Sequence, residues 1–477
     1  MEEFDTIKIV GEDGDALPVS PEKNIPETEE LLELLRGKKI PDFRRAVEDI
    51  PAPDLAEIID EIPKEERLVF YRLLGKNLAT DVFVEMSSEV QEELINSFTD
   101  KELAETLREL YIDDTVDIIE EMPAVVVKRI IKSSTPENRD MINTLLRYPK
   151  DSAGTIMTTE YVKFSPNHTV AQALEHIRKV AIDKETIYTC YITDKDRHLI
   201  GLVTAKSLML SAPETTLDSI MEENVIFATT TEDKEAVALK FDKYGFIALP
   251  VVDNENRLVG IVTVDDAMVV IREEVEEDFA KMAAIIPSEK EYLKTTAFSI
   301  FKSRIPWLLL LMISATFSSA ILSFFEASLI PVLVLFVPML MDTGGNSGSQ
   351  ASVTAIRALS LGEIELSDVL RVLWKEIRVG IFCGVSLGAV AFGKVMLIDR
   401  LIMGNPAVTL IVAFSVSISL AFTIIVAKIV GCTLPLLAKR IGFDPAVMAS
   451  PFITTIVDAI GLILYFIVSA NVFGLTV

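Results

Sequence analysis

Five long apolar stretches occupy the C-terminal part of the chain, at residues 305–326, 329–356, 373–398, 406–434 and 446–473. Each has about 20 residues or more, which is enough for a helix to cross the hydrocarbon core of a membrane. The second stretch runs into the polar segment "VPMLMDTGGNSGSQAS", and the fifth holds Asp458 within "SPFITTIVDAIGLILYF". Because polar groups are costly inside a membrane, they tend to mark a binding or conduction path. The pattern predicts five spans, two of which carry such groups.

The chain before these stretches follows a helical pattern from residue 28 to 148, after an acidic lead-in at 1–27 that predicts poor order or a short strand. The segment "DLAEIIDEIP", which begins at Asp54, returns as "DTVDIIEEMP" from Asp114, with "NLATDVFVEM" as a looser copy between them. Repeated helical units of this kind stack on one another in solenoids. We therefore predict an all-α superhelical domain over 28–148.

A second repeat follows, in which "ITDKDRHLIGLVTAKSLM" from Ile192 matches "VVDNENRLVGIVTVDDAM" from Val251 without a gap. Each copy predicts a strand, a turn, a second strand and then a helix, preceded by another helix. The pair resembles tandem α/β CBS domains, at 149–212 and 213–270. The signature G-h-h-T-x-x-D is complete at 260–266, whereas Ser207 replaces the aspartate in the first copy. The resemblance leaves open whether ATP or another adenosyl nucleotide binds there.

A charged segment, "DDAMVVIREEVEEDFAKMAAIIPSEKEY", predicts a helix from Asp265 to about Tyr292. It connects the repeats to the membrane, and we assign the connecting helix to 271–300 and the transmembrane domain to 301–477.

Charge divides the chain in the same place. Residues from Lys302 onward hold 11 Lys and Arg against 9 Asp and Glu, whereas the preceding part carries a net charge of −28. Such acidity excludes nucleic acid as a partner and favours cations. The N-terminus lacks the pattern of a secretory signal, so we expect the acidic part to remain in the cytoplasm. The scattered Cys190, Cys383 and Cys432 lack metal-ligand spacing and predict core thiols.

Flanking charge gives the orientation of the spans. Basic residues gather between the second and third spans and between the fourth and fifth, at Arg357, Arg371, Lys375, Arg378, Lys439 and Arg440. With five spans and these loops in the cytoplasm, the C-terminus is expected outside the cell.

An isolated carboxylate in hydrocarbon would be expected to take up a proton. The fourth span offers Asp458 only Lys428 as an internal partner, so a mobile cation is the better explanation for an ionised carboxylate. The alternative is an aspartate hydrogen-bonded to a neighbouring helix. The glycines at 344, 345 and 348 predict either close helix packing or unwinding that exposes carbonyls. Packing alone leaves Asn346 and Gln350 unexplained, so we interpret the segment as a pore wall, and we assign no role to Asp342.

The pattern P-M-L-x-x-x-G-G-N-x-G-x-Q at 338–350, together with "TTIVDAIGLILYF", resembles the MgtE family of magnesium transporters and channels. The order of helical domain, CBS pair, connecting helix and five spans matches that family over nearly the whole chain. The resemblance implies a homodimer with a pore between two membrane domains, lined by the second and fifth spans. It implies that Asp458 is the pore aspartate and that pore-lining positions are Pro338, Gly345, Asn346, Ser450 and Thr454.

The same resemblance implies that Mg²⁺ bound to the acidic part closes the pore. The positions that match the family's sensor pattern are Asp113, Asp117, Glu235, Asp266, Glu274, Glu277 and Asp278. Gly245 stands where the family has an aspartate, with Asp242 as a substitute ligand. The alternative for each of these residues is a solvated acidic face.

The resemblance implies a passive Mg²⁺ channel or transporter of the cell membrane, with no enzymatic activity. The sequence offers no P-loop, phosphorylatable aspartate motif or nucleophile–base pair, which argues against an ATP-driven pump. Two alternatives remain open: a carrier of Mn²⁺, Co²⁺ or Zn²⁺, and a membrane-anchored Mg²⁺ or adenylate sensor. The membrane half has no histidine, which disfavours zinc, and an anchor has no use for Asp458.

Overall fold

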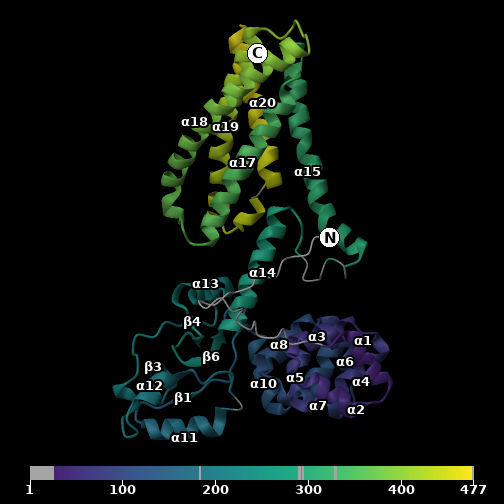
Figure 1. Cartoon of the computed structure of the whole chain (residues 1–477). Coiled ribbons are helices and arrows are strands. Elements are labelled where there is room, and N and C mark those ends of the chain that lie inside the picture. The colour runs from purple at the N-terminus through teal and green to yellow at the C-terminus, as the bar shows by residue number, and fades with distance from the viewer. Residues whose placement is uncertain are drawn as a thin grey trace, which may run out of the picture. The chain divides into compact units, whose positions relative to one another are not determined.

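The computed structural model describes residues 26–181, 184–287, 292, 295–326, 330–448 and 450–474 (Figure 1). The chain forms two compact units, Met1–Ile271 and Arg272–Val477, and each is described by itself. Most of the acidic lead-in predicted over 1–27 lies outside the described residues.

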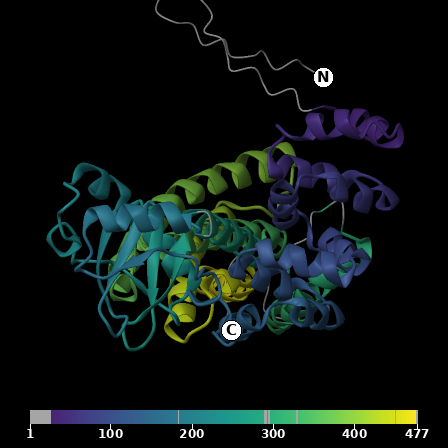
Figure 2. The ribbon, with the colours of Figure 1, turned by 90° about the horizontal axis from the view of Figure 1, so that it is seen from below.

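The first unit begins with short helices that follow one another in a stack, from the purple α1 to the blue α10 (Figures 1 and 2). These helices are α1 (Thr28–Arg36), α2 (Ile40–Val47), α3 (Ala52–Glu61), α4 (Lys64–Leu73), α5 (Lys76–Glu85), α6 (Ser88–Ser97), α7 (Asp100–Glu109), α8 (Ile112–Glu121), α9 (Ala124–Ser133) and α10 (Pro136–Leu145). The predicted all-α domain is confirmed, and the repeated sequence segments form α3 and α8.

From α3 onward the helices have equal lengths and begin at a constant step along the chain. The residue that ends each helix from α3 to α8 takes an extended conformation and points into the core, where it is at most 7% exposed. These residues are Ile62, Leu74, Met86, Phe98, Leu110 and Met122. An extended residue interrupts the helical hydrogen bonds, and its buried side chain anchors the turn. The repeat seen in the sequence, from α3 to α8, is five of these steps.

The two CBS repeats have the same order of elements. The first comprises β1 (Lys163–Phe164), α11 (Val170–Val180), β2 (Thr189–Thr193), β3 (Leu199–Thr204) and α12 (Ala205–Leu210). The second comprises β4 (Ala228–Thr229), α13 (Lys234–Tyr244), β5 (Ala248–Val252), β6 (Leu258–Thr263) and the start of α14 (Val264–Met282). In each three-stranded sheet the central strand pairs parallel with the first strand and antiparallel with the last. The constant spacing of the repeat places β5 and β6 at the positions of β2 and β3, which confirms the prediction.

The two repeats also pair with each other. Thr158 forms a backbone bridge with Ile261, and the Tyr161 hydroxyl donates to the Leu258 carbonyl at 3.2 Å. A Cβ at Gly260 would lie 2.8 Å from the Thr158 carbonyl oxygen, so this close pairing requires glycine. The CBS pair therefore forms one packed body.

The second unit contains the membrane helices α15 (Ala297–Glu326), α17 (Val337–Ser360), α18 (Val369–Lys394), α19 (Leu410–Arg440) and α20 (Ser450–Phe473), with the short α16 (Pro331–Val334) before α17. Among the described residues, four helical segments are long and apolar enough to cross a membrane: Ala297–Phe325, Leu366–Ile402, Leu410–Arg440 and Pro445–Phe473. The remaining predicted span is α17, whose 24 residues include the polar segment. The predicted fold class is confirmed.

Small residues bring these helices together. Gly380, Gly384 and Gly388 recur every four residues on α18, and a Cβ at Gly384 would lie 2.8 Å from the Ala421 carbonyl oxygen of α19. This spacing is typical of closely packed membrane helices. By contrast, α15 stands apart from the other helices along most of its length in Figure 1. It meets α20 near its C-terminal end, where the rings of Phe325 and Phe466 are 4.8 Å apart.

Two predictions about helix continuity need correction. The connecting helix α14 ends at Met282, about ten residues before the predicted end. There Ala284 adopts a left-handed conformation with φ 54, and the Ile285 N–H bonds back to the Ala280 carbonyl, which terminates the helix. The alternative that the glycines of 344–348 unwind the second span is also wrong, because α17 is continuous through them.

Candidate functional site

A row of polar or helix-interrupting residues follows one face of α17. It comprises Pro338, Asp342, Asn346, Gln350 and Thr354, which recur every four residues and are all exposed in the single chain. Four-residue spacing places side chains one above another on a helix. The Asn346 amide donates to a carboxylate oxygen of Asp342 at 3.3 Å. These five residues form what we call the polar stripe.

The neighbouring face of α17 is a packing surface built from glycine. A Cβ at Gly348 would lie 3.0 Å from both Ile453 and Val457 of α20, and one at Gly345 would lie 3.0 Å from Thr454. The same position at Gly345 lies 3.7 Å from a carboxylate oxygen of Asp458. The glycines are therefore explained by close helix packing, and this packing brings Asp458 to the backbone of α17.

The half-buried Asp458 and Thr454 lie one turn apart on α20. Asp342 of the polar stripe is close enough to act on the Asp458 carboxylate electrostatically. The Thr454 hydroxyl donates to the Pro451 carbonyl at 2.8 Å, so its oxygen still has a lone pair to offer. Ser450 is the first residue of α20, but its side chain lies outside the described residues.

Lys428 on α19 does not pair with Asp458. Its side chain is 5% exposed, and its ammonium lies 3.4 Å from the Gln350 amide oxygen. Within the part of the chain that the structure describes, Lys428 makes no ion pair. Gln350, which helix packing alone left unexplained, thus connects the polar stripe to a buried cation.

The second group of carboxylates lies in the first unit, at the start of α8 and of α14. It comprises Asp113, Asp114, Asp117, Glu185 and Asp266, which we call the acidic cluster. Burial raises the pKa of Asp113 to about 9, and the negative charges of Asp114 and Asp266 contribute to this rise. One oxygen of Asp113 is buried without a hydrogen-bond donor among the described residues.

The other members of the acidic cluster behave in the same way. Burial is the largest cause of a raised pKa at each, to about 7 at Asp114, Asp117 and Glu185 and to about 6 at Asp266. The charges that act on them are other carboxylates, and Asp117 differs from the rest in being exposed. Removal of water and mutual repulsion therefore both oppose ionisation of the half-buried members, and repulsion opposes it at the exposed Asp117.

The sequence predicted three members of this cluster and missed two. Asp113, Asp117 and Asp266 come together as the resemblance implied, although α8 and α14 are separated by the whole CBS pair along the chain. Asp114 could have been found, because it precedes Asp117 by three residues on the same amphipathic helix. Glu185 lies in the irregular segment before β2, where no periodic pattern indicates its neighbours.

The remaining predicted residues of α14, Glu274, Glu277 and Asp278, belong to the second unit. Glu277 and Asp444 both pair with Lys281, at 2.5 and 2.6 Å. Asp278 accepts a hydrogen bond from the Ser360 hydroxyl at 3.3 Å, and its burial raises its pKa. Glu274 is half-buried one turn earlier. Glu277 and Asp278 thus belong to the contacts by which α14 is held to α17 and to the segment before α20.

The two predicted positions on α13 differ from each other. Glu235 is half-buried in the first turn, and Asp242 is exposed near the end of the helix. Gly245 caps α13 in the left-handed conformation, with φ 66, and a Cβ there would meet nothing within 4 Å. A glycine at this position therefore serves helix termination.

A further group, which the sequence did not suggest, lies on the turn between β2 and β3. Asp194, Asp196 and His198 bring one ligand atom each within 4.8 Å of one another. His198 Nδ1 lies 2.9 Å from Asp194, and in the second repeat Arg257 makes the equivalent contact with Asp253 at 2.8 Å. Arginine is not a metal ligand, so a role common to both repeats cannot be metal binding. The pair in each repeat is explained as a contact that stabilises the turn.

Family models match along the chain. They are described as the MgtE intracellular N domain, at residues 50–151, the CBS domain, at 153–213 and 217–273, and MgtE, divalent cation transporter, at 337–468. The chain is 35% identical to the magnesium transporter MgtE of Thermus thermophilus, over 89% of this chain and 93% of that protein. It is 32% identical to MgtE of Bacillus subtilis, over 91% and 95%.

A solved structure of the cytosolic domain of the Mg²⁺ channel MgtE in complex with ATP is also similar. It is 36% identical, covers 51% of this chain and 99% of its own, and has a TM-score of 0.49. The predicted family is confirmed by the family models and the two relatives, which between them span all three parts of the molecule. The chain belongs to the MgtE family of divalent cation transporters.

Proposed function

We propose that this chain carries Mg²⁺ passively into the cell through a pore between two copies, lined by α17 and α20. The relatives are named magnesium transporters, which supports the choice of ion. The observation that carries the pore is the polar stripe of α17 with Asp458 beside it. Lipid cannot solvate such a row of polar groups, so its exposure in the single chain requires water or another protein surface.

The proposed pore suits the coordination chemistry of Mg²⁺. This ion loses its water reluctantly and usually binds through one or two carboxylates while several waters remain. Two copies would offer two Asp458 carboxylates to one hydrated ion. The polar side chains of Asn346 and Thr454, on either side of Gly345, would bind the ion's water, and Pro338 and Ser450 belong to the same proposed lining.

We also propose that Mg²⁺ closes this pore by binding to the acidic part of the chain. The acidic cluster fits a hard divalent cation, because its oxygens repel one another and one of Asp113 has no donor among the described residues. Bound Mg²⁺ would replace that repulsion with attraction between α8 and α14. Glu235, Asp242, Glu274, Glu277 and Asp278 remain proposed ligands of further regulatory ions.

Two finer features belong to the same proposal. The intracellular description of the matched N domain supports a cytoplasmic acidic part, and five spans then leave the C-terminus outside. The complete signature of the second CBS repeat, in which the Thr263 hydroxyl donates to Asp266 at 2.5 Å, is where we expect ATP or a related nucleotide.

Mg²⁺ uptake into proteoliposomes tests the proposal, with Asp458→Asn compared against the native chain. Asparagine keeps the volume and removes the charge, so uptake should fall by at least tenfold. The matched control is Glu363→Gln, which removes one charge from an exposed residue after α17. Unchanged uptake in Asp458→Asn would exclude the pore, and would direct attention to the sensor alternative. If uptake does not depend on the Mg²⁺ concentration on the side of the acidic part, only the gating role is excluded.

A further inference from the structure

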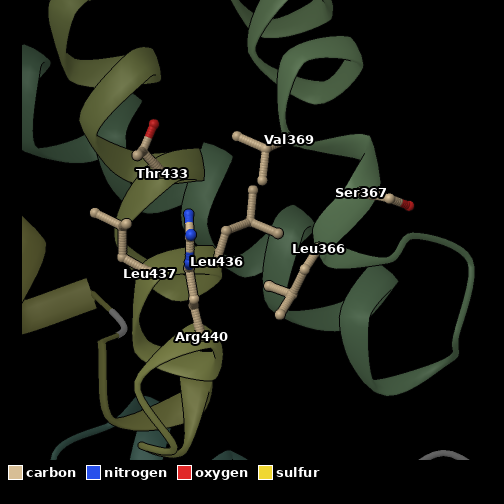
Figure 3. A pocket seen from close by; sticks show the side chains of 7 residues that line it. All are labelled: Leu366, Ser367, Val369, Thr433, Leu436, Leu437 and Arg440. Atoms are coloured by element: carbon tan, nitrogen blue, oxygen red, sulfur yellow. The ribbon is translucent and has the colours of Figure 1, made fainter.

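The membrane unit holds a groove where the end of α19 meets the start of α18. Its lining is shown in Figure 3 and consists of Leu366, Ser367, Val369, Thr433, Leu436, Leu437 and Arg440. Its volume is about 370 Å³. No residue of the polar stripe or the acidic cluster contributes to this lining, so the groove is separate from the proposed ion path. We call it the Arg440 groove.

The chemistry of the Arg440 groove is divided between apolar walls and one cation. Four of the seven lining side chains are leucine or valine. The Arg440 side chain runs back along α19 toward Thr433, between Leu437 and Leu436, while the Ser367 hydroxyl points away from it (Figure 3). Arg440 is exposed and makes no ion pair with any residue in the described ranges. A charge at a helix C-terminus is favourable in itself, but that role does not require a groove.

The groove lies at one end of the membrane-spanning helices. Arg440 is the last residue of α19, and the groove's other wall runs from the short turn before α18 to Val369, the first residue of that helix. The same end holds the contact of Lys281 with Asp444, which follows Arg440 closely in the chain. Other cations lie near it in sequence, including Lys439 at the end of α19 and Lys375 in the second turn of α18. Carboxylates lie there too, and Asp368, next to Ser367, pairs with Arg371 at 2.9 Å, so the cation that the groove offers at the boundary between hydrocarbon and water is Arg440.

We propose that the Arg440 groove binds an anionic phospholipid, with its phosphate on the Arg440 guanidinium and an acyl chain along the leucines. Arginine binds phosphate through two parallel hydrogen bonds, and basic pockets between membrane helices suit anionic head groups. The apolar walls would remain uncovered by a free phosphate ion, whereas an acyl chain buries them. A lipid seated here contacts both α18 and α19, so it stabilises the packing of these two helices.

Native mass spectrometry of the full chain tests this proposal after extraction from nanodiscs made of equal parts phosphatidylcholine and phosphatidylglycerol. The native chain should retain phosphatidylglycerol in preference to phosphatidylcholine. Arg440→Gln should reduce that retention about five- to tenfold, since one basic side chain near the surface contributes roughly that factor. Arg400→Gln, an exposed arginine beyond the other end of α18, is the matched control and should retain the lipid.

A second variant separates the groove from general attraction between charges. Leu366→Trp leaves Arg440 in place but fills the groove, so retention of phosphatidylglycerol should again fall several-fold. Equal retention by Arg440→Gln and Arg400→Gln would overturn the proposal. So would unchanged retention by Leu366→Trp, or displacement of the lipid from the native chain by millimolar inorganic phosphate, which would identify a phosphate site only. These outcomes are independent of Mg²⁺ uptake.

Discussion

Asp458 in the membrane unit and Asp113 in the first unit are both carboxylates held away from bulk water, but their neighbours differ. Asp458 lies against the backbone of α17 at Gly345, beside an exposed row of polar side chains. Asp113 is half-buried among other carboxylates, and burial together with the charges of Asp114, Asp266 and Glu185 raises its pKa; one of its oxygens lacks a donor among the described residues. Close helix packing fixes the position of Asp458, whereas the surroundings of Asp113 oppose its ionisation.

This difference fits the two roles that we propose for carboxylates that bind the same ion. A site that passes ions must keep its geometry while the ion leaves, which rigid helix packing provides. A site that senses ions must change when the ion leaves, which uncompensated repulsion provides. Mutations that alter packing should therefore act on the membrane carboxylate, whereas mutations that alter charge should act on the acidic cluster.

The largest expected effect comes from disturbing the packing at Gly345. In Gly345→Val the new side chain would meet Thr454 at 3.0 Å or closer, which pushes α20 and Asp458 away from α17. Mg²⁺ uptake should fall more than tenfold, since such overpacking typically costs about 1–3 kcal/mol and shifts the backbone. The matched control is Gly393→Val on α18, where a Cβ meets nothing within 4 Å. Equal losses in both variants would mean that valine disturbs these helices in general.

Removal of charge from the acidic cluster should have the next largest effect. In Mg²⁺-free buffer Asp114→Asn relieves repulsion, so hydrogen exchange of α8 in the full chain should slow severalfold. The matched control is Asp54→Asn, at the equivalent position of α3 in the earlier copy of the repeat. In saturating Mg²⁺ the order of the exchange rates should reverse, so that α8 exchanges faster in Asp114→Asn than in Asp54→Asn, because Asp114→Asn has lost a proposed ligand. If α8 is equally protected from exchange in both variants in Mg²⁺-free buffer, repulsion within the acidic cluster does not destabilise α8.

The pH should act on the same cluster with a defined sign. A folded-state pKa raised from the usual carboxylate range to about 9 at Asp113 and about 7 at Asp114 means that the folded state holds more protons than the unfolded state. Stability is then greatest at low pH and is lost as the pH rises through these values. Exchange of α8 in Mg²⁺-free buffer, corrected for the intrinsic effect of pH on exchange, should therefore slow between pH 9 and pH 6. Faster corrected exchange as the pH falls over that range would contradict stabilisation of the cluster by protonation.

The sequence predicted the repeats well because both repeats are periodic. The constant spacing of the CBS copies placed β5 and β6 from β2 and β3 without error. The even step was present in the sequence as well, in the buried apolar residue that ends each helix from α3 to α8, such as Ile62 and Leu74. This constant step was missed because one apolar residue between polar ones does not by itself indicate where a helix ends.

The remaining features of the site depend on contacts that no local pattern records. Lys428 and Gln350 meet from different helices, and Glu185 reaches the acidic cluster from an irregular segment. The end of α14 was missed for another reason: Ala284 takes the left-handed conformation that usually signals glycine, so the sequence gives no warning. The roles that we propose for Asp458, Asp113, Asp117 and Asp266 rest on the family resemblance.

The smallest expected effect is at Gly245, where a substitution changes both the backbone conformation and the charge. Gly245→Asp restores the residue that the family has there, at a position with φ 66 and open space for the new side chain. Aspartate tolerates the left-handed conformation better than most residues, so the cost should be only about 1 kcal/mol. If a regulatory ion binds near Asp242 and Glu235, the added carboxylate should lower the Mg²⁺ concentration that closes the pore by a few-fold. Gly245→Asn, which has the same shape without the charge, should leave that concentration unchanged. If both variants shift the closing Mg²⁺ concentration equally, the change at the end of α13 acts through the backbone and not through a new ligand. Repulsion between carboxylates would then be the basis of gating at the acidic cluster alone, among the described residues of the first unit.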